Sequence, residues 1–600
     1  MSGDVLRVGC CSGFYGDRLS AMREMLEGGD LDVLTGDYLA ELTMLILGKD
    51  QMKDPALGYA RTFLRQAEDC LGLALERGVR IVTNAGGLNP AGLAQRLREV
   101  AEGLGLSPRV AHVQGDNLVG RVEELGLAGS HGKPLTANAY LGAFGIAAAL
   151  RRGADVVVTG RVTDASVVVG PAVAHFGWAP DEYDALAGAV VAGHVVECGA
   201  QACGGNFSGF RALPHDATPI GFPLAEISSD GGAVITKHPG TGGEVTVDTV
   251  TAQLVYEVQS QLYLGPDVSA RLDTIELSDV GADRVRISGV RGEPPPAQLK
   301  VCLNELGGYR NSCEFVLVGL DVEEKAAWVR AQVEAALAPR RPASVEWSLA
   351  RTDHEDADTE EAAASRLRCT VRDPDPMVAG KAFTAPVVEL GLASYPGFTL
   401  TAPPAPATPY GVYRAGYVEQ GAVVHTVVHA DGTAEVVPPP PAFADPAHPQ
   451  PQTPPTRHIR NPDTRRPGTS ATAAPEDVAG ERPLDRATRR LPLGTFVHAR
   501  SGDKGGDANV GLWVDHARAT PERVAWLLDL VTPETVRRLV PEAAELDVEV
   551  YPLPNLGAVN VLVRGLLGEG VAASSRFDPQ AKALGEWVRS RHVDTPEALL

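Results

Sequence analysis

The fold is decided by a stretch in which a short apolar run leads directly into a polar turn, Asp155-Val-Val-Val-Thr-Gly-Arg-Val-Thr-Asp164. The first 120 residues contain three more apolar runs of this kind, each followed by a polar turn, and helical stretches connect them. These runs are residues 6–10, 79–83 and 109–113. Short strands that alternate with helices predict βαβ units, and therefore a parallel sheet with helices on both faces.

The pattern of apolar and polar residues changes after this region. Between about 225 and 437, β-like runs such as 244–251 mix with a helical stretch at 323–337, which predicts an α+β region that could form a second lobe of the N-terminal unit. Residues 438–490 are an expected linker, because 13 of the 46 residues from 438 to 483 are proline and the apolar periodicity is lost.

The last 110 residues have the pattern of a small α/β sandwich. Its expected strands are 494–498, 510–514, 547–551 and 559–563, and its expected helices are 521–530, 534–540 and 579–588. Four strands with helices on one side predict a ferredoxin-like fold. The expected fold class is therefore α/β, with a large N-terminal unit at 1–437, which combines a parallel βαβ sheet with the α+β region, and a C-terminal ferredoxin-like sandwich at 491–600.

Length and composition restrict the class of protein. Six hundred residues allow several domains. The 54 Lys and Arg against 76 Asp and Glu give a net charge of −22, which argues against a nucleic-acid partner, since phosphate contacts need clustered cations. No apolar run is long enough for a membrane span and no signal-like segment opens the chain. Because the eight cysteines are too sparse for a disulfide framework, we expect a cytoplasmic protein without a membrane partner.

Polar residues follow each predicted strand of the N-terminal unit, at the edge of the sheet where ligands bind in such folds. Their side chains could orient a polar substrate or transfer protons. For any single residue the commoner role is that of a turn former or helix N-cap. The set as a whole favours a site, and its members are Asp17, Asn84, Asn89, Asp116, Asn117, Arg161 and Asp164.

Two carboxylates, Asp37 and Glu41, stand four residues apart and would share a face of a helix. Such a pair can bind a cation or give one member a raised pKa. An acidic first turn of a helix explains the pair equally well.

The stretch Gly193-His-Val-Val-Glu-Cys-Gly-Ala-Gln201 contains a further candidate. His194 and Glu197 would face one another on a helix as an acid–base or substrate-orienting pair, and Cys198 could serve as a nucleophile. The spacing lacks the second histidine of zinc hydrolase motifs, so we assign no metal ligands, although metal dependence stays open. The alternative for Cys198 is a small buried apolar residue.

The glycine-rich stretch from Arg500 to Asn509 lies between two predicted strands and could form an anion-binding loop. A tight hairpin needs only one or two residues, so we expect a functional loop here. It lacks the Walker pattern, and the chain has neither a dinucleotide-binding glycine motif nor a serine-hydrolase elbow. The candidate substrate-binding residues of this loop are Arg500, Asp503, Lys504, Asp507 and Asn509.

Together these motifs resemble the acyclic terpene utilisation AtuA family, over nearly the whole chain. The segments that carry the resemblance are Ser12–Asp17, Leu34–Glu41, Thr83–Pro90, Thr159–Ser166, Gly193–Gln201 and Ala499–Asn509. The family pairs a large N-terminal domain with a small ferredoxin-fold domain, which here would be fused.

The resemblance implies an enzyme of branched or terpenoid-acid breakdown that acts on an acyl-CoA thioester, by lyase or hydratase chemistry. His194, Glu197 and Asp164 would then be acid–base groups. Arg161, Arg500 or Lys504 would bind carboxylate or phosphate, and Asn84 and Asn89 would polarise a carbonyl. No cofactor is expected beyond the coenzyme A of the substrate.

Two other functions fit the same motifs. One is a non-catalytic partner or scaffold subunit of an acyl-CoA carboxylase assembly, and the other is a thioester hydrolase that uses Cys198. In each case we expect a homo-oligomer.

Overall fold

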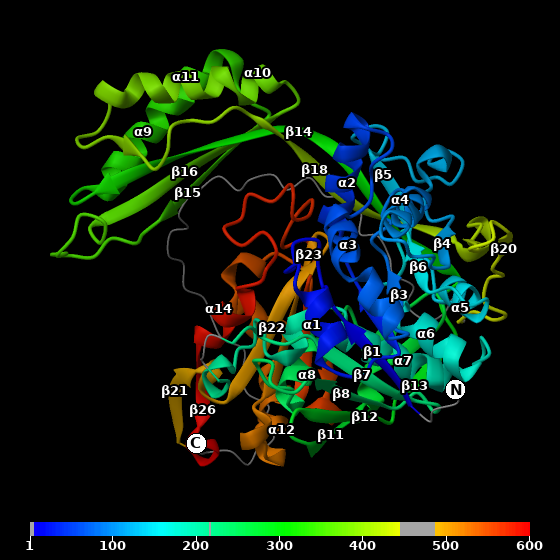
Figure 1. Ribbon diagram of the computed structural model, residues 1–600. Helices are drawn as coiled ribbons and strands as arrows, with labels where there is room; N and C mark the ends of the chain where they lie inside the picture. The colour runs from blue at the N-terminus through cyan, green and yellow to red at the C-terminus, as the bar shows by residue number, and fades with distance from the viewer. Residues whose placement is uncertain (1–4, 215–217, 445–486) are drawn as a thin grey trace.

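The structure is a computed structural model that describes residues 5–214, 218–444 and 487–600. Most of the linker expected at 438–490 lies outside the described residues. The N-terminal unit, the lobe that projects from it and the C-terminal domain are all visible in Figure 1.

A single eleven-stranded sheet forms the centre of the N-terminal unit, in the order β11-β12-β8-β7-β1-β2-β3-β6-β4-β19-β20. Five adjacent strands of this sheet, β1-β2-β3-β6-β4, run parallel, as predicted. They are β1 (Val5–Cys10), β2 (Val33–Gly36), β3 (Arg80–Thr83), β6 (Val156–Thr159) and β4 (Val110–Gln114). Antiparallel strands extend both edges: β7 (Pro223–Ser228), β8 (Ala233–Lys237), β12 (Arg284–Ser288), β11 (Glu276–Gly281), β19 (Thr426–Val428) and β20 (Ala434–Val436).

Helices cover both faces of the parallel strands, because alternate residues of each strand are apolar on opposite sides. In β6, Val156 and Val158 pack into one core while Val157 packs into the other. The first core includes α1 (Ala21–Gly28), α3 (Arg61–Glu76) and α4 (Pro90–Gly103). The second includes α5 (Phe144–Arg151), α6 (Ser166–Phe176) and α7 (Tyr183–Val196). The predicted parallel α/β sheet is therefore confirmed.

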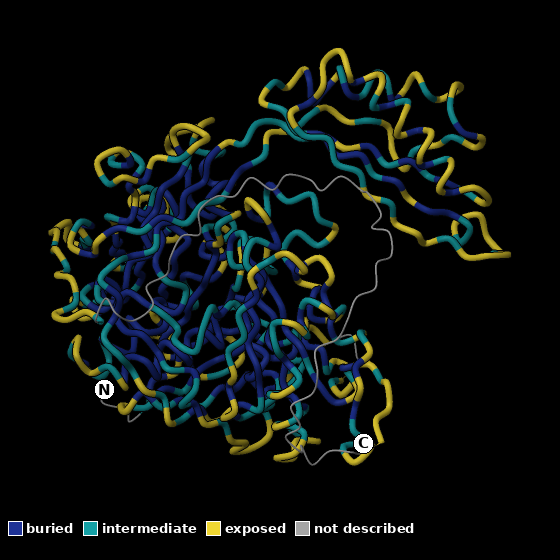
Figure 2. The backbone as a smooth tube through the Cα atoms, turned by 180° about the vertical axis from the view of Figure 1, so that it is seen from behind, coloured by how far each residue is buried: buried dark blue, intermediate teal, exposed yellow. Residues whose placement is uncertain are grey.

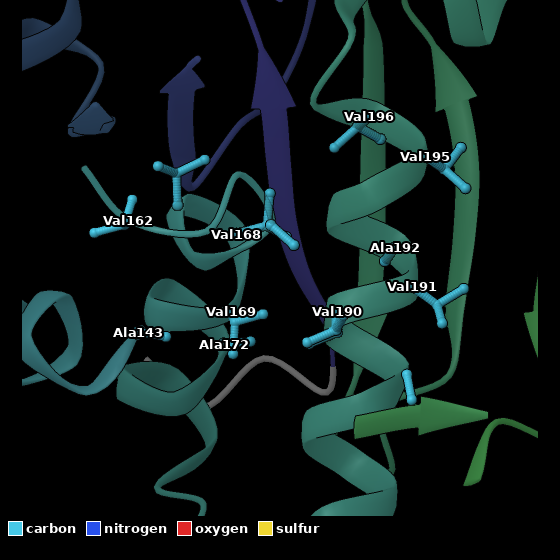
Figure 3. Close-up of a cluster of buried hydrophobic side chains, with 14 of the residues drawn as sticks. Ala143, Val162, Val168, Val169, Ala172, Val190, Val191, Ala192, Val195 and Val196 are labelled. Carbon is cyan, nitrogen blue, oxygen red and sulfur yellow. The ribbon is translucent and has the colours of Figure 1, made fainter. Parts of the chain in front are cut away.

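Every residue of helix α7 from Ala185 to Val196 is buried. Figure 3 shows its valines beside those of α6, with Val190 near Val169 and Ala172. A helix that is apolar on every side must lie inside the protein. The polar residues at its C-terminal end are therefore carried into the interior.

A lobe projects from the body on two long strands, β14 (Gln298–Val318) and β18 (Thr408–Glu419). The first half of β14 pairs with β5 (Thr136–Ala139) on the body, and its second half pairs with β16 (Ala364–Asp373) in the lobe. The lobe is completed by β15 (Ser344–Ala350), β17 (Thr399–Leu400), α9 (Val322–Leu337), α10 (Pro376–Ala379) and α11 (Lys381–Glu389), around a core of its own. Figure 2 shows the buried backbone concentrated in the body.

The C-terminal domain is a four-stranded antiparallel sheet in the order β22-β23-β25-β24, packed against three helices. Its elements are β22 (Val497–Lys504), β23 (Asp507–Val514), β24 (Val548–Leu553), β25 (Ala558–Val563), α12 (Pro521–Leu530), α13 (Pro533–Leu539) and α14 (Leu584–Ser590). A short ribbon of β21 (Thr488–Pro492) and β26 (His592–Pro596) flanks the sheet. This is the predicted α/β sandwich, although its last helix begins later than expected.

Two predictions about the secondary structure of particular segments were wrong. Residues 500–509 are a hairpin and not a long loop, because β22 and β23 pair from Val497 to the Lys504–Asp507 pair and leave only Gly505 and Gly506 as the turn. Gly505 has a φ of +70°, which favours glycine. The run at 244–251 is mostly helix α8 (Val247–Leu254), whose N-terminus is capped by reciprocal bonds between Thr246 and Thr249.

The C-terminal sheet docks directly on the N-terminal unit, just after α8. Gly511 of β23 lies against Val255, since a Cβ on this glycine would come within 2.2 Å of Val255 Cγ2. Gly502 of β22 lies as closely against the ring of Tyr256. Trp513 completes the contact by packing into the N-terminal core. The glycines of the C-terminal hairpin therefore allow close approach between domains.

Candidate active site at the domain junction

The residues predicted at the strand ends are brought to one edge of the sheet. Asp37 follows β2, while Arg161 and Asp164 follow β6. Glu41 begins α2 (Glu41–Lys53), and His194 and Glu197 lie at the C-terminal end of α7. Each of these residues except Asp164 and Glu41 is almost fully buried.

Arg161 is the central cation of this group. Its guanidinium forms an ion pair with Asp164, Nη1 to Oδ1 at 2.9 Å, and donates a hydrogen bond to the carbonyl of Leu39 at 2.7 Å. The same group stacks on the ring of Tyr140, 4.3 Å from its centroid. Only 2% of Arg161 is exposed, and its Nε has no hydrogen-bond partner among the described residues. The guanidinium is thus fixed in one orientation.

The carboxyl of Asp37 is held by Asn84. Asn84 Nδ2 donates to Asp37 Oδ1 at 2.5 Å, and the backbone N–H of Tyr38 donates to Asn84 Oδ1 at 2.8 Å. Burial raises the pKa of Asp37 well above its usual value, and the negative charge of Asp164 adds to this. The site thus favours the protonated form of Asp37, and Asn84 positions its carboxyl.

Glu41 has the opposite character. Its Oε1 accepts hydrogen bonds from the Tyr140 hydroxyl at 2.9 Å and from Lys300 Nζ at 3.3 Å. Burial alone would raise the pKa of Glu41, but the charges of Lys300, Arg161 and Lys504 outweigh it and hold the pKa well below its usual range. Glu41 therefore remains a carboxylate. The two carboxylates do not share a helix face as predicted, because α2 begins at Glu41 and Asp37 lies in the segment before it. Their pKa values are shifted in opposite directions.

His194 and Glu197 form the predicted pair, with His194 Nδ1 and Glu197 Oε1 3.2 Å apart. Burial and the charge of Lys504 lower the pKa of His194 to about 4, so that its ring is neutral at pH 7. Burial raises the pKa of Glu197, and the charges of Asp164 and Glu257 raise it further. The far atoms of the pair, His194 Nε2 and Glu197 Oε2, are buried and have no hydrogen-bond partner among the described residues.

The C-terminal hairpin of the same chain reaches this group. The charge of Lys504, at the end of β22, acts on Glu41, Asp164, His194 and Glu197. Beside it, burial and the charges of Glu257 and Glu41 raise the pKa of Asp503 to about 7. The C-terminal domain therefore completes the site in its own chain.

Arg500 makes a contact between the domains. It donates to the carbonyl of Asn206 at 2.7 Å and to Gln201 Oε1, and it stacks on Tyr256, 4.4 Å from the ring centroid. These bonds hold Arg500 at the contact between the domains, where its charge acts on Cys198 and Tyr256, while the charge of Lys504 acts on the acidic group.

Four more candidates have their side chains engaged in structural bonds. Asn89 caps α4 through the N–H of Gly92, and Asn117, which is exposed, accepts the N–H of Val119. Asp507 accepts bonds from Arg564 and from the N–H of Gly565. Asn509 bonds to Asn560 and to the backbone of Glu257. The turn and capping roles weighed for such residues account for these bonds.

Cys198 lies beside Glu197, where its backbone touches Gly13 closely enough that a Cβ at Gly13 would lie 2.4 Å from the Cys198 carbonyl carbon. Burial raises the pKa of the Cys198 thiol well above its usual value, and the charges of Glu197 and Glu257 add to the rise. A nucleophilic cysteine needs a lowered pKa. The raised pKa of the thiol thus argues against Cys198 as the nucleophile.

Three site residues were missed by the sequence analysis: Tyr140, Lys300 and Glu257. Tyr140 follows β5 and Lys300 lies within β14, so neither is in a motif with its own signal. Glu257 has a positive φ of 57°, held by the Asn509 bond to its N–H. A non-glycine residue in this conformation is uncommon and often marks a functional site, but the sequence does not reveal it.

The fold and site define a two-domain α/β protein with a buried acid–base cluster at the junction of its domains. Comparison with protein families agrees with this division. Residues 6–429 match the acyclic terpene utilisation family protein AtuA, and residues 491–594 match the AtuA ferredoxin-like domain. The chain therefore belongs to the acyclic terpene utilisation family AtuA, and the ferredoxin-like assignment of its C-terminal domain is confirmed. No curated protein matches the chain. Among the described residues, no helix is long and apolar enough to cross a membrane.

Proposed function

We propose that the protein is an enzyme that acts on a branched or terpenoid acyl-CoA thioester by lyase or hydratase chemistry. The observation that carries the proposal is the His194–Glu197 pair, a neutral imidazole beside a carboxyl whose raised pKa favours its protonated form, with one polar atom on each that has no hydrogen-bond partner among the described residues. A proton acceptor and a proton donor held side by side are what reversible addition to a thioester, or cleavage beside it, requires.

In the tautomer that carries its proton on Nδ1, His194 donates to Glu197 Oε1 and keeps a lone pair on Nε2. In the hydratase reaction that Nε2 takes a proton from water while the oxygen adds to the β-carbon, and the Glu197 carboxyl gives its proton to the α-carbon. In the lyase reaction Nε2 takes the proton of a β-hydroxyl, the bond between the α- and β-carbons breaks, and Glu197 protonates the α-carbon. The enolate oxygen formed in either case lies within the field of Arg161 and Lys504.

The opposite charges of the cluster have separate tasks in this proposal. Lys504 and Arg161 receive the anionic or polarised end of the substrate, which the net charge of −22 would otherwise repel. Glu41 holds Tyr140 and Lys300 in position through hydrogen bonds. The raised pKa of Asp37 favours a carboxyl that can donate its proton to a substrate oxygen.

The test is to incubate the purified protein with a panel of branched acyl-CoA thioesters, both unsaturated and β-hydroxylated, and to detect products by mass. We expect turnover of at least one member, and a loss of about 10²-fold or more in kcat for His194→Gln. His592→Gln, which changes an exposed histidine, is the matched control. An absence of turnover together with stable co-purification of an acyl-CoA carboxylase would overturn the proposal and favour the scaffold function. Unchanged kcat in both His194→Gln and Lys504→Met would reject the assignment of residues.

A further inference from the structure

A second group of polar side chains lies at the domain junction, apart from the acid–base cluster. It consists of Asp248, His498 and Asp515. Each offers one atom that can bind a metal ion, and these atoms all lie within 4.8 Å of one another. Asp248 is in the first turn of α8 in the N-terminal unit, while His498 is on β22 and Asp515 follows β23 in the C-terminal domain. The group therefore spans the boundary between the two domains.

The ring of His498 is held in place by a hydrogen bond and by two aromatic neighbours. Its Nδ1 is 3.1 Å from the hydroxyl of Ser208, and its ring packs against Phe207 and Trp513, with centroids 5.2 and 5.5 Å away. Its Nε2 is 4.0 Å from Asp515 Oδ2, which is too long for a hydrogen bond. Histidines that bind metals are oriented in this way, through the ring nitrogen that does not bind the ion.

Both carboxylates are held through one oxygen each. Asp248 Oδ1 accepts from Trp513 Nε1 at 2.8 Å and lies 2.7 Å from His516 Nδ1. Asp515 Oδ1 accepts the N–H of Ala517 at 3.0 Å. The remaining oxygens, and Nε2 of His498, have no hydrogen bond among the described residues. Each of the three oriented residues thus keeps an atom with a free lone pair, and one possible ligand atom of each residue lies within 4.8 Å of the others.

The group offers two carboxylates to a cation. The basic residues in contact with these carboxylates are His516, whose Nδ1 lies 2.7 Å from Asp248 Oδ1, and Arg518, whose Nε is 3.6 Å from Asp515 Oδ2 on a side chain that is 58% exposed. In a tetrahedral zinc site the ligand atoms lie about 3.4 Å apart, given bonds of about 2.0–2.1 Å. The 4.0 Å separation of His498 Nε2 and Asp515 Oδ2 exceeds this spacing by about 0.6 Å, and because the ligand atoms of the group lie up to 4.8 Å apart, the three side chains must draw closer together to bind the ion.

We propose that Asp248, His498 and Asp515 bind a divalent transition-metal ion that fastens the C-terminal domain to the N-terminal unit. Nitrogen and carboxylate ligands suit Zn²⁺, with water as a fourth ligand. The ion acts as a structural link: it holds β22, and therefore Lys504 at the end of that strand, against the N-terminal unit. The proposal does not depend on the reaction that the acid–base cluster performs.

The experiment is to measure metal content after equilibration of the full chain with Zn²⁺ or Co²⁺ and removal of free ion. We expect one equivalent per chain, and visible absorption of tetrahedral Co²⁺. Asp515→Asn keeps an oxygen for the Ala517 cap and should fold, but it should bind at least 10-fold more weakly, as should His498→Gln. His592→Gln should bind like the parent chain.

Thermal unfolding gives a second readout, in which the unfolding temperature of each chain is compared with and without Zn²⁺. Zn²⁺ should raise the unfolding temperature of the parent chain and of His592→Gln, because a ligand that binds only the folded state stabilises it. It should not do so for Asp515→Asn. Absence of stoichiometric metal in the parent chain, or equal uptake by Asp515→Asn and the parent, would overturn the proposal and leave the three residues as a hydrogen-bonded contact between domains.

Discussion

Asn509 Oδ1 accepts the backbone N–H of Glu257 at 2.8 Å, across the boundary between the C-terminal hairpin and the N-terminal unit. Asn509 is completely buried, and its Nδ2 donates to Asn560. The bond fixes Glu257 in its left-handed conformation. A residue first predicted to bind substrate therefore orders a segment of the site from the other domain.

Replacement of Asn509 by alanine should destabilise the protein by about 1 kcal/mol or more, because it leaves the partly buried N–H of Glu257 without its partner. Urea unfolding measures this effect. Asn555→Ala is the control, because it also removes an amide side chain that bonds across the domain boundary. Asn555 Nδ2 donates to the carbonyls of Leu272 and Ile275, so its loss leaves no backbone N–H without a partner. We expect a smaller loss of stability for the control. An equal loss of stability in both variants would show that the unpaired N–H of Glu257 adds no cost of its own.

Gly511→Ala should weaken the docking of the C-terminal domain. The new Cβ would lie 2.2 Å from Val255 Cγ2 and 2.8 Å from the carbonyl oxygen of Val255, so the two segments must separate. Overpacking of this kind costs about 1–3 kcal/mol. Calorimetry of the full chain should show a lower unfolding temperature. Gly421→Ala, at a glycine with no heavy atom within 4 Å of an added Cβ, should unfold like the parent chain; a matching decrease in this control would remove the explanation by steric overlap.

Asp116→Asn should change the pH dependence of stability. Asp116 is buried and accepts bonds from Asn138 Nδ2 and the N–H of Arg161, and burial raises its pKa to about 6. The folded chain therefore keeps the proton up to about pH 6, whereas the unfolded chain releases it near pH 4. Stability from this group is greatest below about pH 4 and falls as the pH rises to 6, by about 3 kcal/mol in total.

The asparagine variant cannot titrate at this position, so its unfolding free energy should lack that decrease. Urea unfolding of both chains at pH 4.5, 5.5 and 7 gives the difference. Parallel curves for the parent and Asp116→Asn over this range would contradict the assigned shift.

The sequence predicts the parallel sheet well because each strand is a short apolar run between polar turns, as in Val156–Thr159. It also indicates that Arg161 and Asp164 lie at the edge of the sheet, since βαβ topology brings strand ends together. His194 and Glu197 instead face one another at the end of α7, as their spacing predicts. Lys300 could not be found in this way, because it reaches the site only through the pairing of β14 with β5. Helix α8 was missed for another reason: its alternating valines and threonines favour a strand, and its capping pair lacks the usual glutamate.

The 500–509 hairpin was mispredicted as a loop because the reason for its glycines is a tertiary contact. Its glycines suggested an open loop, but Gly502 and Gly511 are required by the close approach of Tyr256 and Val255. Those two residues are about 250 positions away in the sequence, and no local pattern records the contact. Glycine composition indicated an unusual backbone there, while the tertiary structure alone shows its cause.

Arg161 allows the sharpest test of the buried cluster. Its guanidinium simultaneously pairs with Asp164, donates to Leu39 and stacks on Tyr140. Arg161→Met leaves Asp164 without its cation and should cost about 3–5 kcal/mol in unfolding free energy. Arg161→Lys keeps the charge but has no planar group to stack on the ring, so it should recover only part of that loss.

The matched control is the exposed pair of Arg109 and Asp155, which lie 2.8 Å apart. Arg109→Met should change stability by no more than about 1 kcal/mol, because water and salt screen the pair. Urea unfolding at low and high salt distinguishes the two sites: the Arg109 effect should fall with salt, while the Arg161 effect should persist. If Arg161→Lys is as stable as the parent chain, the stacking and the shared orientation of the guanidinium do not hold the cluster together, and its positive charge alone is sufficient.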